Sequence, residues 1–187
     1  MTRNITGNLS NEKAFTLIEV IVSLVLAGIL AAVVGLGLVR ITQGYVFAKQ
    51  NSETLQKAQI AMTRIVKELG AAEPQSGTAT AITAAGTTSI TFTRCEPIGS
   101  SIFISNTISF SGGYAYLNLN QTGNANLLNN VVTDGSSFFA YYDSAGNALT
   151  APVPVARIGR IDVTLKVTGA NNQTSTFTNS VWIHESY

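Results

Sequence analysis

The sequence contains little charge. Only 11% of its 187 residues are Asp, Glu, Lys or Arg, against roughly 25% in an ordinary soluble domain. One charged residue lies in residues 15–39, seven lie in residues 40–69 and ten in residues 70–187, where 51 Gly, Ser, Thr or Asn residues keep the chain polar. The net charge is +1, so composition gives no electrostatic reason to expect nucleic acid as a partner.

Cysteine and histidine are nearly absent, with Cys95 and His184 the only ones. One chain therefore forms no internal disulfide and no zinc site built from several thiolates. We expect Cys95 to be buried or half-buried, with a reactive or intermolecular thiol as the alternative. We expect the His184 imidazole to be hydrogen-bonded or to face solvent. No nucleophile and base pair and no phosphate-binding glycine loop is recognisable. The sequence predicts a protein that is not an enzyme and needs no metal or cofactor.

Residues 20–39 form an apolar run without charge, VIVSLVLAGILAAVVGLGLV. At about 1.5 Å per helical residue this run spans roughly the 30 Å hydrocarbon core of a bilayer. A cleaved secretory signal has a shorter apolar core of about 7–15 residues, and a lipoprotein signal needs a cysteine directly after its core. A retained membrane helix fits better. Arg3 and Lys13 precede the run and favour a cytoplasmic N-terminus, although Arg40 and Lys49 follow it.

Glu19 is the one charged residue of segment 15–39. A carboxylate deep in the bilayer costs several kcal/mol without a partner, and a place at the interface is the simple explanation. The string KAFTLIEV at residues 13–20 supplies another, because it resembles the processing site of type IV prepilins and pseudopilins. In that family a short polar leader ends in a small residue and prepilin peptidase cuts before a Phe. The new N-terminus is then methylated, and the fifth mature residue is Glu.

The resemblance implies roles for three residues. Cleavage would fall between Ala14 and Phe15, Phe15 would become the N-methylated first residue, and Glu19 would be the fifth. The family usually has Gly before the cut, so Ala14 is a less common substitute. The new amine at Phe15 and the Glu19 carboxylate have opposite charges, which at 4 Å attract by about 4 kcal/mol at an effective dielectric of 20. We expect Glu19 to pair with the amine of its own chain or of a neighbour, and so to serve subunit assembly.

The apolar run continues into residues 40–69 without a break signal. Apolar residues recur there at three- and four-residue steps, which predicts an amphipathic helix. Arg64 and Glu68 have the i,i+4 spacing of a helical ion pair, and Gly70 is a stop signal. We expect one helix from Phe15 to Leu69, roughly 80 Å long.

Two features of this helix leave alternatives open. Its four glycines, Gly28, Gly35, Gly37 and Gly44, favour either local melting, at roughly 1 kcal/mol each relative to Ala, or close helix packing in the membrane. Residues 40–69 carry five basic and two acidic groups. A solvated face or a subunit contact is the favoured interpretation, and a DNA-binding face is the alternative.

Residues 70–187 change to a two-residue period. After a Gly/Ala/Thr-rich connection at 70–87, six segments rich in β-branched and aromatic residues predict strands; these are 89–94, 101–110, 114–119, 137–142, 160–167 and 174–183. Turn signals separate them, including the sequence DSAGN at 143–147, in which we expect Asp143 to cap the turn rather than to bind calcium. The expected head is one antiparallel sheet of four to six strands packed on the second half of the helix.

The head carries a second, more diffuse resemblance. The segments FFAYYD at 138–143, 152–167 and 55–69 look like the heads of minor pilins of the W type and of type II secretion minor pseudopilins of the J type. The absence of a Cys pair disfavours the disulfide-closed loop of many major pilins.

The sequence thus predicts an α+β, pilin-like chain with four parts. These are a cleaved leader (1–14), a hydrophobic transmembrane and assembly helix (15–39), the amphipathic half of the helix (40–69) and an antiparallel β head (70–187). The resemblance implies a minor pilin, held in the bacterial inner membrane with its head in the periplasm, that initiates or caps a type IV pilus. Its partners would be other pilins or pseudopilins, the prepilin peptidase and methyltransferase, and the inner-membrane assembly platform, with no nucleic acid.

Two alternatives remain open. One is a minor pseudopilin of a type II secretion system. The other, from a different class, is a membrane-anchored β-domain that binds carbohydrate or another surface ligand, with the prepilin-like string a coincidence.

Overall fold

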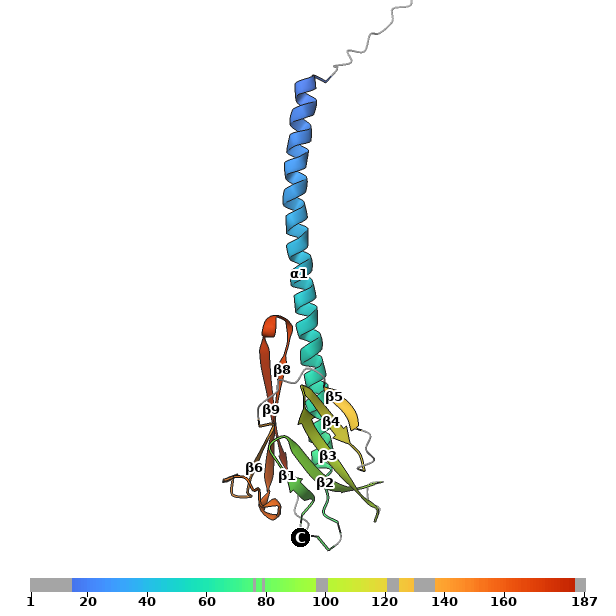
Figure 1. Ribbon diagram of the computed structural model, residues 1–187, viewed down its shortest axis with the longest axis vertical. Helices are drawn as coiled ribbons and strands as arrows, with labels where there is room; N and C mark the ends of the chain where they lie inside the picture. The colour runs from blue at the N-terminus through green and yellow to red at the C-terminus, as the bar shows by residue number, and fades with distance from the viewer. Residues whose placement is uncertain are drawn as a thin grey trace, which may run out of the picture. The chain divides into compact units, whose positions relative to one another are not determined.

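The computed structural model describes residues 15–75, 77–78, 80–96, 101–120, 125–129 and 137–183. The chain divides into two compact units, Met1–Val46 and Phe47–Tyr187. Helix α1 (Leu17–Gly70) begins in the first unit and ends in the second (Figure 1). The expected single helix is confirmed, with a start two residues later and an end one residue later than predicted.

The first unit presents an apolar helix surface. Between Leu17 and Val46, 18 large apolar side chains are at least 45% exposed, and the best 18-residue window has a mean hydropathy of 2.8. The helix is long and apolar enough to cross a membrane. Its hydroxyl groups bond within the helix, since Ser23 Oγ donates to Val20 O and Thr42 Oγ1 to Leu38 O, both at 2.9 Å. Such hydroxyls need no water as a partner.

The four glycines of the first unit do not interrupt α1, which is helical at each of them. A Cβ added at any of the four would meet no atom of the chain within 4 Å. Nothing inside this chain therefore requires glycine at these positions, and local melting is not seen.

The second unit contains the end of α1 and two antiparallel sheets (Figure 1). The first sheet has the order β1-β2-β3-β4-β5 and the second the order β7-β6-β8-β9. The first comprises β1 (Ile82–Ala85), β2 (Ser89–Cys95), β3 (Phe103–Ser111), β4 (Tyr114–Asn118) and β5 (Ala125–Asn129). The second comprises β6 (Phe139–Tyr142), β7 (Ala148–Leu149), β8 (Arg160–Thr168) and β9 (Thr174–Trp182). The 3-10 helices η1 (Val155–Arg157) and η2 (Ala170–Asn172) complete the described elements.

The prediction of one sheet is therefore wrong, although all six predicted strands are present. The strands that were missed are β1, β5 and β7, whose sequences are ITAA, ANLLN and AL. Their Ala and Asn content gives little β propensity, so pairing with a neighbouring strand, and not local sequence, makes them strands. Part of the expected 70–87 connection is strand β1 for this reason.

Strand β8 shows the predicted alternation most clearly. Ile161, Val163, Leu165 and Val167 are fully buried, while the residues between them are partly exposed. These side chains join the inner residues of β2, β3 and β6 in one core, together with Ala58, Met62, Ile65 and Leu69 of α1. The apolar stripe of α1 is buried only from Ala58 onward.

The two sheets are joined by aromatic side chains and by the β1–β2 turn. The rings of Phe110 and Phe138 stack with centroids 4.1 Å apart, and Phe138 N donates to Thr87 O at 2.8 Å. The Tyr141 hydroxyl donates to Gly86 O at 2.7 Å, and burial raises the pKa of this phenol. A close-packed contact of this kind fixes the two sheets to each other.

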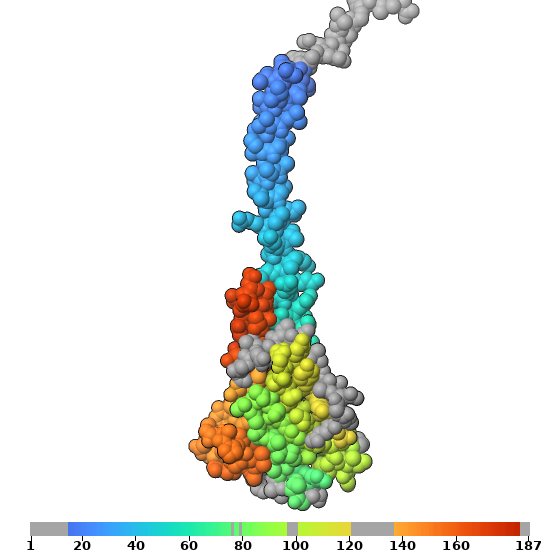
Figure 2. All heavy atoms as spheres, in the orientation of Figure 1, coloured from blue at the N-terminus to red at the C-terminus, as the bar shows by residue number. Residues whose placement is uncertain are grey.

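The tip of the β8–β9 hairpin, red in Figure 2, lies beside the part of α1 that belongs to the second unit. Ala170 N donates to Asn51 Oδ1 at 2.9 Å. A Cβ at Gly169 would overlap the Asn51 carboxamide, so a larger residue here would displace this side chain and its hydrogen bond with Ala170.

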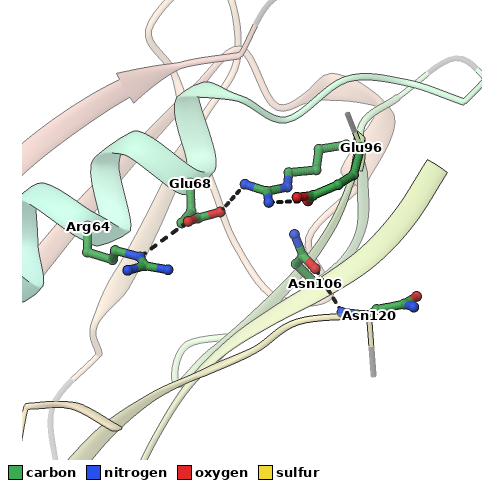
Figure 3. A network of polar contacts seen from close by, with 6 residues as sticks. Arg64, Glu68, Glu96, Asn106 and Asn120 are labelled. Carbon is green, nitrogen blue, oxygen red and sulfur yellow. Dashed lines mark hydrogen bonds and ion pairs between the residues drawn. The ribbon is translucent and has the colours of Figure 1, made fainter. Parts of the chain in front are cut away.

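A cluster of charged side chains joins α1 to β2 (Figure 3). The carboxylate of Glu68 accepts from Arg64 Nε at 3.3 Å and from an Arg94 guanidinium nitrogen at 2.5 Å. Arg94 also pairs with Glu96. The Glu68 side chain is 7% exposed and Arg94 19%, whereas Arg64 is 51% exposed. The predicted Arg64–Glu68 pair is confirmed, but the stronger partner of Glu68 comes from a distant strand.

We predict that Arg94→Ala lowers the free energy of unfolding by about 3 kcal/mol, because it leaves a buried carboxylate without its closest partner. Arg64→Ala, which removes an exposed partner of the same carboxylate, should cost about 1 kcal/mol or less. Urea unfolding of the full chain in detergent, followed by tryptophan fluorescence, measures both. Equal losses in the two variants would contradict the assignment of Arg94 as the main partner.

Candidate functional site

Thr16 and Glu19 form a capping box at the start of α1. Glu19 N donates to Thr16 Oγ1 at 3.3 Å, while Thr16 N and Thr16 Oγ1 donate to Glu19 Oε2 at 3.3 and 3.2 Å. This is the reciprocal arrangement that satisfies free amide groups at a helix N-terminus. It explains why the helix begins at Leu17 and not at Phe15, since the N-cap residue is not itself helical.

The capping box places the Glu19 carboxylate beside the backbone that follows Phe15. The carboxylate lies in the first turn of α1, where the helix dipole stabilises negative charge, and it accepts from the amide of the residue directly after Phe15. The Phe15 side chain is 81% exposed. If the backbone nitrogen of Phe15 carried a positive charge, that charge would lie one residue from the amide that the Glu19 carboxylate already contacts.

On sequence alone we expect Glu19 to pair with the Phe15 amine of its own chain or of a neighbour, and we give Thr16 no role. The signal was present, because a Thr followed three residues later by Glu before an apolar run is the sequence pattern of a capping box. Ala14 and the whole segment 1–14 lie outside the described residues, as does His184.

The surface around this site is apolar and uncovered. The 18 exposed apolar side chains between Leu17 and Val46 are each worth about 1.5 kcal/mol or more when removed from water. Their sum exceeds the whole stability of a typical domain, about 5–15 kcal/mol. The segment therefore has to be covered by lipid or by other protein chains.

Residues 9–35 match the prokaryotic N-terminal methylation motif. This motif is the processing signal of type IV pilins and pseudopilins, so the N-terminal end of the chain is pilin-like. No curated protein and no solved structure matches it. The motif implies processing by prepilin peptidase, a place in the inner membrane and later assembly with other pilins. Pilins are structural proteins and not enzymes.

Within the described part of this pilin-like chain, no group of three or more His, Cys, Asp or Glu side chains is placed to hold a metal ion. Asp143 instead caps the turn before β7, as predicted. Its Oδ1 accepts from Ala145 N at 3.0 Å and from Asn147 N at 2.8 Å, and its Oδ2 accepts from Asn147 Nδ2 at 3.0 Å. The hydrogen bonds from Asn147, then that from Ala145 and the nearby Arg157 charge, lower the pKa of Asp143 despite its partial desolvation.

The head also holds the single thiol of the pilin. Cys95 is 9% exposed, which confirms the expected burial. A hydrogen bond with the Glu73 side chain raises the pKa of this thiol, and burial and the Glu73 charge act in the same direction. The thiolate is the reactive form of cysteine, so this environment protects Cys95 from alkylation and oxidation.

We predict that iodoacetamide alkylates Cys95 more slowly in the folded pilin than in the same chain in guanidinium. A raised pKa means a smaller thiolate fraction at each pH below it, so the rate should start to rise at a higher pH in the folded chain. Glu73→Gln should shift this rise to lower pH, whereas Glu53→Gln, a change on the exposed face of α1, should not. Equal pH profiles for the folded and denatured chains would contradict the assignment.

Proposed function

We propose that this pilin is a minor subunit that initiates or caps the assembly of a type IV pilus. The observation that carries an assembly role is the uncovered apolar surface of α1, which begins within the methylation motif. The resemblance of segments 55–69, 138–143 and 152–167 to minor-pilin heads supports the minor role. A type II secretion minor pseudopilin is the alternative that shares the same fold and chemistry.

The proposed processing falls between Ala14 and Phe15, and Phe15 becomes the N-methylated first residue. Four parts follow from this proposal: the leader 1–14, the membrane and assembly helix 15–39, the amphipathic part 40–69 and the head 70–187. Before assembly the N-terminus faces the cytoplasm and the head faces the periplasm. Arg3 and Lys13 then lie on the cytoplasmic side, where basic residues are enriched. The inner-membrane assembly platform would then receive the processed subunit.

Glu19 is the proposed assembly residue. Among the described residues, its carboxylate accepts from the neutral amide and hydroxyl of Thr16. Cleavage replaces the amide nitrogen of Phe15 by a cationic amine, which is a stronger partner for the same carboxylate. In apolar surroundings an ionised Glu without a cationic partner is energetically unfavourable. Only subunits whose register supplies such an amine would therefore pack stably, whether the amine belongs to the same chain or to its neighbour.

The capping box offers a competing role for Glu19, since loss of an N-cap interaction alone costs roughly 1 kcal/mol. Thr16→Val separates the two roles because it removes the capping hydroxyl and leaves the carboxylate in place. Glu53→Ala is a second control, because Glu53 lies on the same helix, is 55% exposed and pairs with Lys49 at 3.9 Å.

We predict that deletion of the gene abolishes surface pili and twitching and leaves enzyme secretion normal. Wild-type protein, Thr16→Val and Glu53→Ala should restore pili, and Glu19→Ala should not, since it leaves the new amine without its carboxylate. Pilus counts by electron microscopy and assays of secreted enzymes, made in parallel on the same strains, measure both outcomes.

Normal pili with lost secretion in the deletion strain would overturn the pilus assignment in favour of the secretion pseudopilus. Incorporation of Glu19→Ala protein into filaments at the wild-type level would contradict the assembly role of Glu19. Equal loss in Thr16→Val and Glu19→Ala would assign the effect to helix capping.

A further inference from the structure

Three side chains form a row across the outer face of the second sheet. Tyr142 of β6 is in register with Arg160 of β8, and Arg160 is in register with Trp182 of β9. On β9 the neighbouring Val181 points to the core and is 5% exposed, whereas Trp182 is 59% exposed. Because side chains alternate across a strand, the three residues share the face that points away from the core.

The row is held together by Arg160. Its guanidinium carbon lies 4.1 Å from the ring centroid of Tyr142 and 5.6 Å from that of Trp182, which is cation–π geometry. Asp162, two residues along β8, lies 3.0 Å from Arg160 Nε. The guanidinium is therefore fixed from several sides, and the indole is oriented while most of its surface stays in contact with water.

The position of β9 leaves the indole accessible. Among the described strands, β9 is an edge of its sheet, so no further strand flanks Trp182. The next row on the same face consists of Ala140, Asp162 and Ser180. Two of these side chains are small and the third is the carboxylate that holds Arg160. An exposed aromatic ring, a fixed ion pair and a hydroxyl thus lie side by side on this face, with the Arg160 and Asp162 side chains 26% and 20% exposed.

These groups match the chemistry of a neutral saccharide. A pyranose ring has an apolar face of C–H groups, which packs on an aromatic ring, and a rim of hydroxyls, which pairs with carboxylate, guanidinium and hydroxyl groups. Trp and Tyr provide such a large, rigid contact with a polar end, and a few placed polar groups fix the orientation of a ligand. The Arg160–Asp162 pair supplies both donors and acceptors without net charge.

Charge and size disfavour other partners. A nucleic acid or an acidic polymer needs unpaired positive charge, whereas Asp162 neutralises Arg160 in this row. A stable protein interface covers about 800 Å² on each partner around an apolar or aromatic centre. Beyond the two aromatic rings, the outward residues of β8 and β9 are polar: Thr164, Lys166, Thr176, Thr178 and Ser180. The aromatic surface therefore has the size of one or two sugar rings.

We propose that the Tyr142–Arg160–Trp182 row, with Asp162 beside it, binds a neutral saccharide on the outer face of the second sheet. Trp182 stacks on the sugar ring, and Arg160 and Asp162 bond its hydroxyls. This site lies on the head and uses none of the residues assigned to processing or assembly, so it does not depend on the proposed role in the pilus.

Trp182 is the only tryptophan of the chain, so intrinsic fluorescence reports on this site alone. The full chain, purified in an amine-oxide detergent without a sugar head group, is titrated with cellohexaose, chitohexaose and maltohexaose. At least one of them should change the Trp182 emission in a saturable way and reduce its quenching by acrylamide, with a dissociation constant of about 1 mM or below. No change with any of the three up to about 10 mM would overturn the proposal.

Variants test the same site by retention on cellulose, chitin and amylose resins. Trp182→Ala should weaken retention about tenfold and Trp182→Phe less, because Phe keeps an aromatic face. Tyr114→Ala is the matched control, since Tyr114 is an aromatic residue, 42% exposed, on the other sheet. It should bind like wild type. Far-UV circular dichroism checks that each variant is folded.

An assembly assay separates a saccharide site from a subunit contact. Trp182→Ala should complement pilus formation at the wild-type level. Loss of pili in a folded Trp182→Ala variant, or protection of Trp182 by other subunits but by none of the saccharides, would show that the row is a protein contact and would overturn the proposal. Equal retention of Trp182→Ala and Tyr114→Ala would do the same.

Discussion

The apolar surface of α1 between Leu17 and Val46 is the constraint on which the rest of the molecule depends. No described residue of its own unit covers these side chains, and their exposure to water would cost more than a domain gains on folding. The segment is therefore stable only in lipid or against other chains. A methylation motif at the start of such a helix fits a subunit that leaves the lipid bilayer and packs against other subunits.

The head is stabilised differently, because it folds with few charged residues and one helix. Its core combines the last turns of α1 with the inner faces of two sheets. Glu68 and Arg94 add one buried ionic contact between helix and sheet, and such a contact is costly when one partner is missing. Polar side chains cover the outer face of β8 and β9, which leaves Trp182 as the exposed aromatic exception.

Local patterns predicted the long helix, the alternation in β8, the turn-capping Asp143 and the burial of Cys95, because each depends on residues close together in sequence. Contacts between distant segments were beyond sequence reasoning. The division into two sheets depends on which strands pair, the edge strand β7 has little propensity of its own, and Arg94 meets Glu68 from 26 residues away. The row of Tyr142, Arg160 and Trp182 likewise exists only through the register of three strands. The capping role of Thr16 differs from these contacts, because the sequence pattern of a capping box was present and was missed.

We propose above all that this chain is cut, methylated and assembled through the start of its helix. The most direct test is the intact mass of the full-length protein, extracted from membranes of strains with and without prepilin peptidase. The account predicts a chain that starts at N-methyl-Phe15 in the first strain and an uncut precursor in the second. A chain with the same uncut N-terminus in both strains, or a cut at another position, would contradict it.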